Sequence, residues 1–295
     1  MREIVKRVEN VLDKMGYDYC DYFGCFDIAA KKGRKLILIK VLSNVDSIQE
    51  EQATSIKTIS SNLDSTALIV GEKTRRQELE EDIIYNRFDI PTMSIETVEN
   101  IFSHESKPLV IRRRGGFFVE IDAGLLKKKR QAHDLTQAKL AEKVGTTKKC
   151  IYEHEKTNKK AAQETAEKIE SFLGKVSVPV SLEWYMESTN TKPKGSFESM
   201  VSRHFNSIGF ETSHVYQAPF NIIAKSKEIM ILSEAQENSE KIEKILSEMI
   251  SFSKLVRKPI IAITKEEAEL DIPTVRAKDL KNCSARDIKK LVKKW

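Results

Sequence analysis

The chain has 295 residues, of which 32% are charged and 40% hydrophobic, and its formal net charge is +6. This length allows two or three domains with buried cores. No apolar run approaches the ~20 residues that a membrane span needs, and the amphipathic N-terminal segment is unlike a signal peptide. The composition predicts a soluble, cytoplasmic protein that does not interact with membranes.

Four cysteines are scattered along the chain, at Cys20, Cys25, Cys150 and Cys283. They form no Cys-x-x-Cys pair and no cluster with histidine, so zinc is not expected, and their usage is typical of a reducing compartment. We predict no cofactor, no metal site and no catalytic residue.

Residues 1–105 are expected to form an α/β sandwich domain with the element order αβββαβαβα. The segment LILIKVL is almost continuously apolar, which is typical of a central strand buried on both faces. The expected helices span residues 2–15, 47–63, 74–86 and 95–103, and the expected strands span 17–23, 26–30, 36–42, 66–70 and 91–93.

Residues 106–122 have the pattern of a β-hairpin with an arginine-rich arm. Two apolar triplets flank Arg112, Arg113, Arg114 and a Gly-Gly turn. The segment leads directly into the next domain. It is either a plain connector or a wing whose arginines contact DNA phosphates.

Residues 123–175 predict four helices, with a tight turn between the second and the third. Thr136 and Thr147 are expected N-caps, because a threonine hydroxyl can accept a bond from a free backbone N–H of the helix that follows. Gly145 is placed at the C′ position of the second helix, where a left-handed conformation is common. A helix, a glycine turn and a second helix at this spacing predict a helix-turn-helix.

The helix from Lys148 to about Glu155 has one strongly apolar residue, Ile151, so most of its side chains remain available for DNA. Lysine can donate to guanine or to phosphate, and glutamate can accept from cytosine. Gln137 begins the preceding helix, where it could hold a phosphate together with the helix N-terminus. The predicted DNA-binding residues are Gln137, Thr147, Lys148, Lys149, Tyr152, Glu153, Lys156, Arg112, Arg113 and Arg114.

Positive charge is concentrated in the same region. Residues 127–160 contain eleven Lys and Arg against four Asp and Glu, a net charge of +7, so the rest of the chain sums to −1. Such a concentration indicates a polyanionic partner.

The stretch LTQAKLAEKVGTTKKCIYEHEK, residues 135–156, closely resembles the helix-turn-helix of phage Cro and repressor proteins, the XRE type. Seven residues fall where that family's pattern places them, namely Gln137, Leu140, Ala141, Gly145, Thr147, Ile151 and Glu155. One departure is Lys156-Thr157-Asn158, where the family usually has a glycine. The resemblance implies binding to double-stranded DNA, and Cro-type proteins bind as dimers.

Residues 176–195 are expected to form a connector that holds Trp184 and Tyr185 and ends in the polar linker STNTKPKG. Residues 196–295 then repeat the order of the first hundred. Phe220 to Lys225 parallels Phe26 to Lys31, and a helix expected over 239–255 parallels the one expected over 47–63. The tetrapeptide Asp-Ile-Pro-Thr occurs in both halves. We therefore predict a second copy of the first domain.

The αβββαβ order resembles the fold of restriction endonucleases and Holliday-junction resolvases. Those enzymes need an acid on one strand and an acid-x-Lys motif on the next, because two carboxylates hold Mg²⁺ near the scissile phosphate. Asp27 and Lys40 suit this pattern, but Leu38 stands where the second acid belongs. Glu50 or Glu51 could replace that acid. In the second copy Asn221 parallels Asp27, and the position of Lys40 falls near Ser233, so both copies are expected to be degenerate.

The whole arrangement resembles an archaeal family of helix-turn-helix transcriptional regulators. The residues that carry this resemblance are LIKVLSNVDSI (38–48), RRGGFFVEID (113–122) and the helix-turn-helix. The predicted fold is α/β plus all-α, with two restriction-endonuclease-like αβββαβ domains flanking a central helix-turn-helix domain with a β-hairpin. The predicted function is sequence-specific, non-enzymatic regulation of transcription by a homodimer. The alternatives are a metal-dependent nuclease targeted by the helix-turn-helix, and an antitoxin or interaction scaffold.

Overall fold

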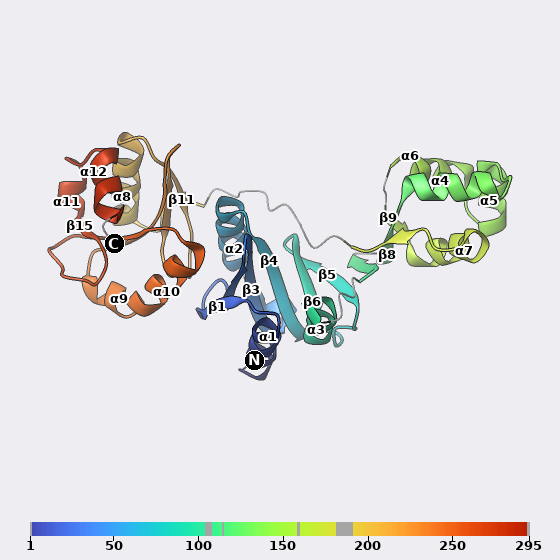
Figure 1. Ribbon diagram of the computed structural model, residues 1–295, viewed down its shortest axis with the longest axis horizontal. Helices are drawn as coiled ribbons and strands as arrows, with labels where there is room; N and C mark the ends of the chain where they lie inside the picture. The colour runs from blue at the N-terminus through green and yellow to red at the C-terminus, as the bar shows by residue number, and fades with distance from the viewer. Residues whose placement is uncertain (1, 104–107, 114, 158–159, 181–190, 294–295) are drawn as a thin grey trace. The chain divides into compact units, whose positions relative to one another are not determined.

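The computed structural model describes residues 2–103, 108–113, 115–157, 160–180 and 191–293 (Figure 1). The chain divides into two compact units. One comprises Met1–Leu42, Ser47–Ile69 and Trp184–Trp295, and the other comprises Ser43–Asp46 and Val70–Glu183. Within the described part, no helix is both long and apolar enough to cross a membrane.

The first half of the first unit begins with a helix and an antiparallel meander. Helix α1 buries five aliphatic side chains on one face, and β3 is buried over most of its length. Strands β1, β2 and β3 pair in sequence order, with Ile28 opposite Ile39. The elements in this part of the chain are α1 (Arg2–Lys14), β1 (Asp18–Asp21), β2 (Ile28–Lys32), β3 (Lys35–Asn44), a 3-10 turn (Val45–Ser47), α2 (Glu50–Leu63) and β4 (Thr66–Lys73). Residues Ser43–Asp46 and the end of β4, from Val70, belong to the second unit.

The second half of this unit contains a five-stranded sheet in the order β11-β12-β13-β14-β15. Strands β11 to β13 are antiparallel neighbours, with Ile222 opposite Ser233, and β14 and β15 join in parallel. The elements are α8 (Ser196–Ser207), β11 (Glu211–His214), β12 (Ile222–Lys225), β13 (Met230–Gln236), α9 (Ser239–Glu243), α10 (Leu246–Val256), β14 (Ile260–Thr264), β15 (Thr274–Arg276), α11 (Ala277–Leu280) and α12 (Ala285–Lys293).

The two halves of the first unit pack against each other in a reciprocal way. Helix α10 packs on β1 and β2 of the first half, while α2 of the first half packs on β11. The ring of Phe252 lies 5.4 Å from the ring of Phe26 and 5.4 Å from that of Phe220. The backbone approaches so closely that a Cβ built on Gly24 would lie 2.1 Å from the carbonyl oxygen of Gln217.

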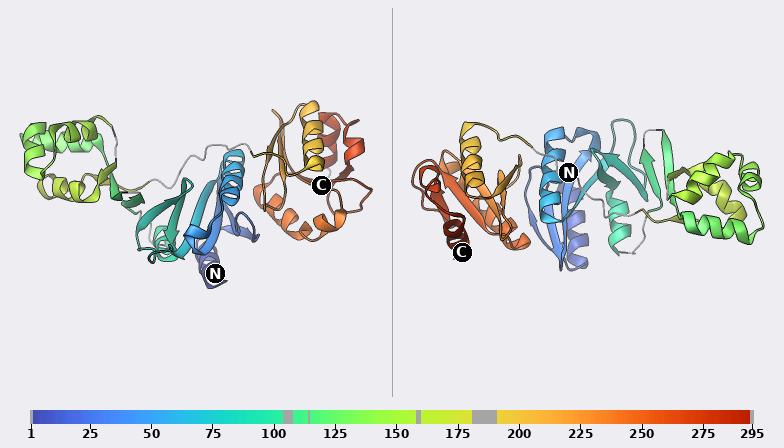
Figure 2. Two further views of the ribbon diagram at one scale, coloured as in Figure 1. Left: turned by 180° about the vertical axis from the view of Figure 1, so that it is seen from behind. Right: turned by 90° about the horizontal axis from the view of Figure 1, so that it is seen from above.

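The second unit contains strands that pair both in parallel and antiparallel, together with the helices α3 to α7. Figure 2 shows these elements from two further sides. Its strands follow the order β6-β5-β7-β8-β10, and β9 pairs with β8. The elements are β5 (Ile83–Arg87), β6 (Ile90–Ser94), α3 (Ile95–Ser103), β7 (Val110–Arg113), β8 (Gly116–Ile121), α4 (Ala123–Ala132), α5 (Gln137–Val144), α6 (Lys148–Lys156), β9 (Lys160–Ala162), α7 (Gln163–Leu173) and β10 (Ser177–Val178).

Two expected helices are different in the structure. The helix expected over 74–86 is absent, because its charged first part forms a loop and its end is strand β5, which pairs with β6 and β7. Ile83, Ile84 and Tyr85 are residues of high strand propensity, and pairing decides their conformation. The helix expected over 239–255 is divided at Ile245, whose backbone (φ −119°, ψ 10°) is not helical. Trp184 and Tyr185, predicted in the connector, lie outside the described residues.

Candidate nucleic-acid interface

The turn between α5 and α6 is built by side chains that satisfy free backbone groups. The Thr136 hydroxyl accepts a hydrogen bond from the Lys139 N–H at 3.2 Å, and the Thr147 hydroxyl accepts one from the Cys150 N–H at 3.1 Å. Gly145 ends α5 with a φ of 68°, in the left-handed region. Thr147 therefore holds the first turn of α6 through its hydroxyl.

The helices enclose a core that extends into the hairpin. Leu140, Val144 and Ile151 are buried at its centre, together with Val119 and Ile121 of β8. Strand β8 thus serves as a wall of the helical domain, which fixes the hairpin to the helix-turn-helix.

Arg130 of α4 and Glu155 of α6 form a nearly buried ion pair. Their side chains are 11% and 4% exposed, and the guanidinium donates to both carboxylate oxygens, at 2.5 and 3.0 Å. Burial alone raises the pKa of Glu155, but hydrogen bonds from Arg130 and Gln137 lower that pKa below its ordinary value. The pair ties α6 to α4.

Gln137, which was predicted to hold a phosphate, has a partner within the protein. Its side-chain amide donates to Glu155 at 2.8 Å and so braces the ion pair. Its partner is 18 residues further along the chain, beyond the range of local sequence patterns.

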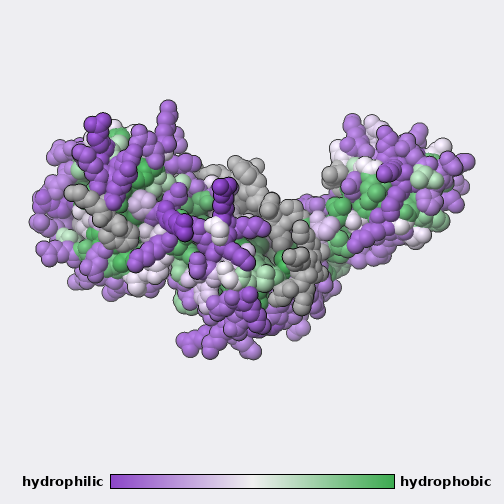
Figure 3. All heavy atoms as spheres, in the orientation of Figure 1, coloured by the Kyte–Doolittle hydropathy of each residue, from purple (hydrophilic) through white to green (hydrophobic). Residues whose placement is uncertain are grey.

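The outer face of α6 displays most of the residues that were predicted to contact DNA. Lys148, Lys149, Tyr152 and Lys156 are exposed, and Glu153 is half-buried. The Lys156 ammonium lies 5.8 Å from the centre of the Tyr152 ring. The opposite face buries Ile151, as expected, and also His154, which is 7% exposed. In the space-filling view of Figure 3, hydrophilic residues cover most of the surface that faces the viewer.

The hairpin arginines have unequal surroundings. The Arg112 guanidinium lies 4.5 Å from the centre of the Phe117 ring and 3.6 Å from the Glu80 carboxylate. Arg113 is exposed, and Arg114 lies outside the described residues.

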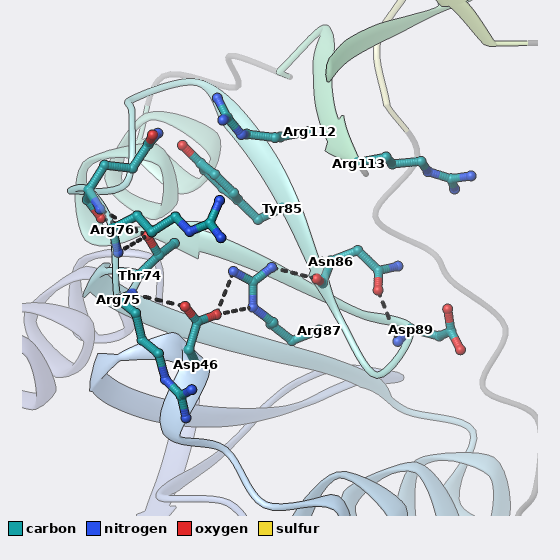
Figure 4. A pocket seen from close by; sticks show the side chains of 11 residues that line it. Asp46, Thr74, Arg75, Arg76, Tyr85, Asn86, Arg87, Asp89, Arg112 and Arg113 are labelled. Atoms are coloured by element: carbon teal, nitrogen blue, oxygen red, sulfur yellow. Dashed lines mark hydrogen bonds and ion pairs between the residues drawn. The ribbon is translucent and has the colours of Figure 1, made fainter. Parts of the chain in front are cut away.

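A hollow of about 680 Å³ lies beside the hairpin, within the second unit (Figure 4). Sequence reasoning did not find this hollow, because its residues come from four separate segments. Its lining residues are Asp46, Thr74, Arg75, Arg76, Gln77, Tyr85, Asn86, Arg87, Asp89, Arg112 and Arg113.

In the first half of the first unit, Asp27 and Lys40 form a buried ion pair. The Lys40 ammonium donates to Asp27 Oδ1 at 3.1 Å and to the Gly24 carbonyl at 2.7 Å, while the Val41 N–H donates to Asp27 Oδ2 at 2.6 Å. Burial raises the pKa of Asp27, although the Val41 N–H and Lys40 lower it in part. Both carboxylate oxygens are engaged within the protein.

In the second half Asn221 occupies the place of Asp27. Its side-chain carbonyl accepts from the Ala235 N–H at 2.9 Å, just as Asp27 accepts from Val41. Because Ile39 and Ser233 hold the same register position, the residue that corresponds to Lys40 is Glu234. This position lies next to Ser233, near which it was expected.

Glu234 is a buried acid in the place of a lysine. Its side chain accepts from Gln236 at 2.6 Å through Oε1, and burial raises its pKa to about 8. Glu198 and His214 are also buried and are hydrogen-bonded to each other.

These two sites do not suit the Mg²⁺ that the restriction-endonuclease-like fold uses. Leu38 offers no oxygen, and the Asp27 carboxylate is held by Lys40 and by a backbone N–H. Across the described residues, no group of three or more His, Cys, Asp or Glu is placed to hold a metal ion.

Comparison with known proteins identifies two domains. The PD-(D/E)XK superfamily domain matches residues 1–108, and the helix-turn-helix domain matches residues 126–180. The chain is thus confirmed to combine a restriction-endonuclease-like domain with a helix-turn-helix. No solved structure matches the chain.

Several archaeal relatives extend over most of the chain. A Pyrococcus abyssi protein is 31% identical over 258 residues, which cover 84% of this chain and 82% of the relative. A Methanocaldococcus jannaschii protein is 30% identical over 87% of this chain and 84% of its own. A Methanobrevibacter smithii protein is 29% identical over 94% and 88%. All three are named as HTH-type transcriptional regulatory proteins.

Proposed function

This chain belongs to the archaeal family of HTH-type transcriptional regulatory proteins, and from that premise we propose that it regulates transcription by binding specific sites in duplex DNA. The observation that carries the proposal is the outer face of α6. Three lysines and a tyrosine are exposed there on a helix whose other face is fixed by Ile151 and by the Arg130–Glu155 pair.

In this proposal, α6 lies in the major groove. Lys148, Lys149, Tyr152 and Glu153 contact base edges, because lysine donates to guanine and glutamate accepts from cytosine. Lys156 and Arg113 contact phosphates, which positions the helix without specifying sequence. Thr147 contributes through the N-terminus of α6, where free N–H groups favour an anion.

Genome-wide footprinting of the bound protein, followed by titration of the recovered duplex, tests this placement. Replacing Lys149 with Ala is expected to weaken specific binding by ~1–3 kcal/mol and to relax the preference at one position. Lys168→Ala, an exposed lysine on α7, is the matched control. Unchanged affinity and specificity in the Lys148→Ala, Lys149→Ala double variant would refute the assignment.

We also propose that the two halves of the first unit are copies of one domain. The support is that each half has a helix followed by a three-stranded antiparallel meander. In each, a side-chain oxygen before the second strand (Asp27 or Asn221) accepts a hydrogen bond from a backbone N–H of the third strand. Helix α10 of the second half packs on β1 and β2 of the first half.

A homodimer remains part of the proposal, because one recognition helix contacts only a few base pairs. Two helices spaced by ~34 Å would occupy successive turns of the major groove. Light scattering at micromolar concentration should give twice the chain mass, and the footprint should be palindromic. A monomer that protects one short site would refute the dimer.

A second candidate function, metal-dependent DNA cleavage, has one observation in its favour: the match of the PD-(D/E)XK superfamily domain to residues 1–108. We propose that this domain has a structural role, because Leu38 stands where such chemistry needs a second acid, and the Asp27 carboxylate is held by Lys40 and by the Val41 N–H.

A further inference from the structure

The hollow beside the hairpin has the size of a small-molecule site. Its volume of about 680 Å³ lies within the ~300–1,000 Å³ that is usual for ligand pockets. Five arginines and two aspartates line it, a net charge of +3, and the other lining residues are neutral. A binding partner for this surface must be anionic.

Three segments bring the arginines together. The loop after β4 supplies Arg75 and Arg76, β5 supplies Arg87, and β7 supplies Arg112. Strands β5 and β7 are parallel neighbours, which places Arg87 and Arg112 on adjacent strands. In Figure 4, Arg76, Arg87 and Arg112 lie around Tyr85, whereas Arg113 extends away from them.

Only part of this positive charge is neutralised within the protein. Asp46 accepts from the Arg87 guanidinium at 2.7 Å and from the Arg75 backbone N–H at 2.8 Å. Burial alone raises the pKa of Asp46, but these bonds hold that pKa below its ordinary value. The Asp46 charge is therefore committed to holding Arg87 and the loop in place.

Arg112 and Arg76 are less strongly paired than Arg87, so their guanidinium groups can bind an anion. Arg112 has the Glu80 carboxylate at 3.6 Å, but both side chains are at least 36% exposed, so the pair is weak. Arg76 is exposed and makes no ion pair with any residue that the structure describes. Like charges gathered in a hollow repel one another, and a bound anion would relieve that repulsion.

We propose that this hollow binds the phosphate groups of a polyphosphorylated ligand, with Arg76 and Arg112 in direct contact and the Asp46–Arg87 pair as their support. Guanidinium groups bind phosphate through paired, charge-assisted hydrogen bonds, which explains why all five basic residues are arginines. The phosphates belong either to a free compound of nucleotide size or to the backbone of bound DNA. Strand β7 connects the site to β8 and thus to the core of the helix-turn-helix domain.

Calorimetric titration of the full-length protein with inorganic triphosphate, without DNA, tests whether the hollow binds a free polyphosphorylated compound. We expect one saturable site per chain, weakened roughly tenfold by Arg76→Ala, as loss of a charge-assisted bond predicts. Arg76 lies on an exposed loop, so its replacement leaves the core intact. Arg34→Ala, in the β2–β3 turn of the other unit, is the matched control, and Lys148→Ala, Lys149→Ala controls for binding at α6. Both controls should keep full affinity.

Measurement of DNA affinity against salt concentration tests whether the phosphates are those of bound DNA. If the phosphates are those of DNA, Arg76→Ala flattens the slope of log K against log salt by about 0.9 for one lost contact. If the ligand is a free compound, the slope is unchanged while triphosphate binding falls. Triphosphate binding that Arg76→Ala leaves intact, or no triphosphate binding together with an unchanged slope, overturns the proposal. The triphosphate titration needs no DNA, so its result is independent of the function proposed for α6.

Discussion

Lys40 and Glu234 occupy the same register position in the two halves of the first unit, although one is a cation and the other an acid. Lys40 is paired with Asp27, whereas Glu234 stands next to an amide, Asn221, in the corresponding arrangement. At this position the first half therefore holds a buried ion pair, and the second half holds a buried acid whose pKa burial raises to about 8.

The raised pKa of Glu234 predicts that Glu234→Gln stabilises the protein at alkaline pH. The folded protein keeps this carboxyl protonated up to about 8, while the unfolded chain ionises it near 4.5. The unfolded state binds fewer protons between these values, so the free energy of unfolding falls as pH rises through this window. The difference in melting temperature between Glu234→Gln and the parent protein should widen from pH 5 to pH 8. Glu237→Gln, an exposed acid nearby in sequence, should show no such widening.

Removing one member of the Arg130–Glu155 pair should destabilise the helix-turn-helix. Arg130→Ala leaves a largely buried carboxylate without its partner, which typically costs ~3–5 kcal/mol. Urea unfolding, monitored by helical circular dichroism, measures the loss. Replacing both residues with apolar ones of similar volume should restore much of it, and a double variant as unstable as Arg130→Ala would contradict this account.

The same pair predicts a loss of stability in acid. The folded pKa of Glu155 lies below its ordinary value, so its contribution is complete above 4.5 and is lost as pH falls through the lower, folded value. Unfolding measured across this acid range should show a smaller pH dependence in Glu155→Gln than in the parent protein.

The two described hairpin arginines should differ in their effect on DNA affinity. Arg113→Ala should flatten the slope of log K against log salt by about 0.9, because this exposed side chain is proposed to contact a phosphate. Arg112→Ala should leave the slope unchanged when the ligand of the hollow is a free compound. A slope that Arg113→Ala does not alter would make the hairpin a connector only.

No cleavage of duplex or branched DNA is expected with Mg²⁺ or Mn²⁺. The Asp27 carboxylate is occupied by Lys40 and the Val41 N–H, and Leu38 supplies no oxygen ligand. Incubation of labelled DNA with purified protein is the measurement. Cutting that Asp27→Asn abolishes would establish catalysis and contradict the structural role proposed for this domain.

Local patterns predicted the helix-turn-helix well, because caps such as Thr136 and Thr147 act on backbone groups three residues away. Features that depend on distant partners were not predictable in the same way. The pairing of β5 with β6 and β7 replaced an expected helix, and Gln137 found a partner at Glu155. The arginines of the hollow come from three segments that are far apart in the sequence and meet only in the folded protein.

The interrupted course of the first unit has a consequence for biosynthesis. Its N-terminal part leaves the ribosome well before Phe252, whose ring packs against Phe26. The recognition helices, whose core is continuous in sequence from β8 to Val176, emerge in between. We expect the helix-turn-helix domain to be complete before α10 has been synthesised, so the surface around Phe26 is still exposed at that stage. A nascent or truncated chain that ends before α8 would therefore expose an apolar surface around Phe26. We expect chaperones to bind that surface.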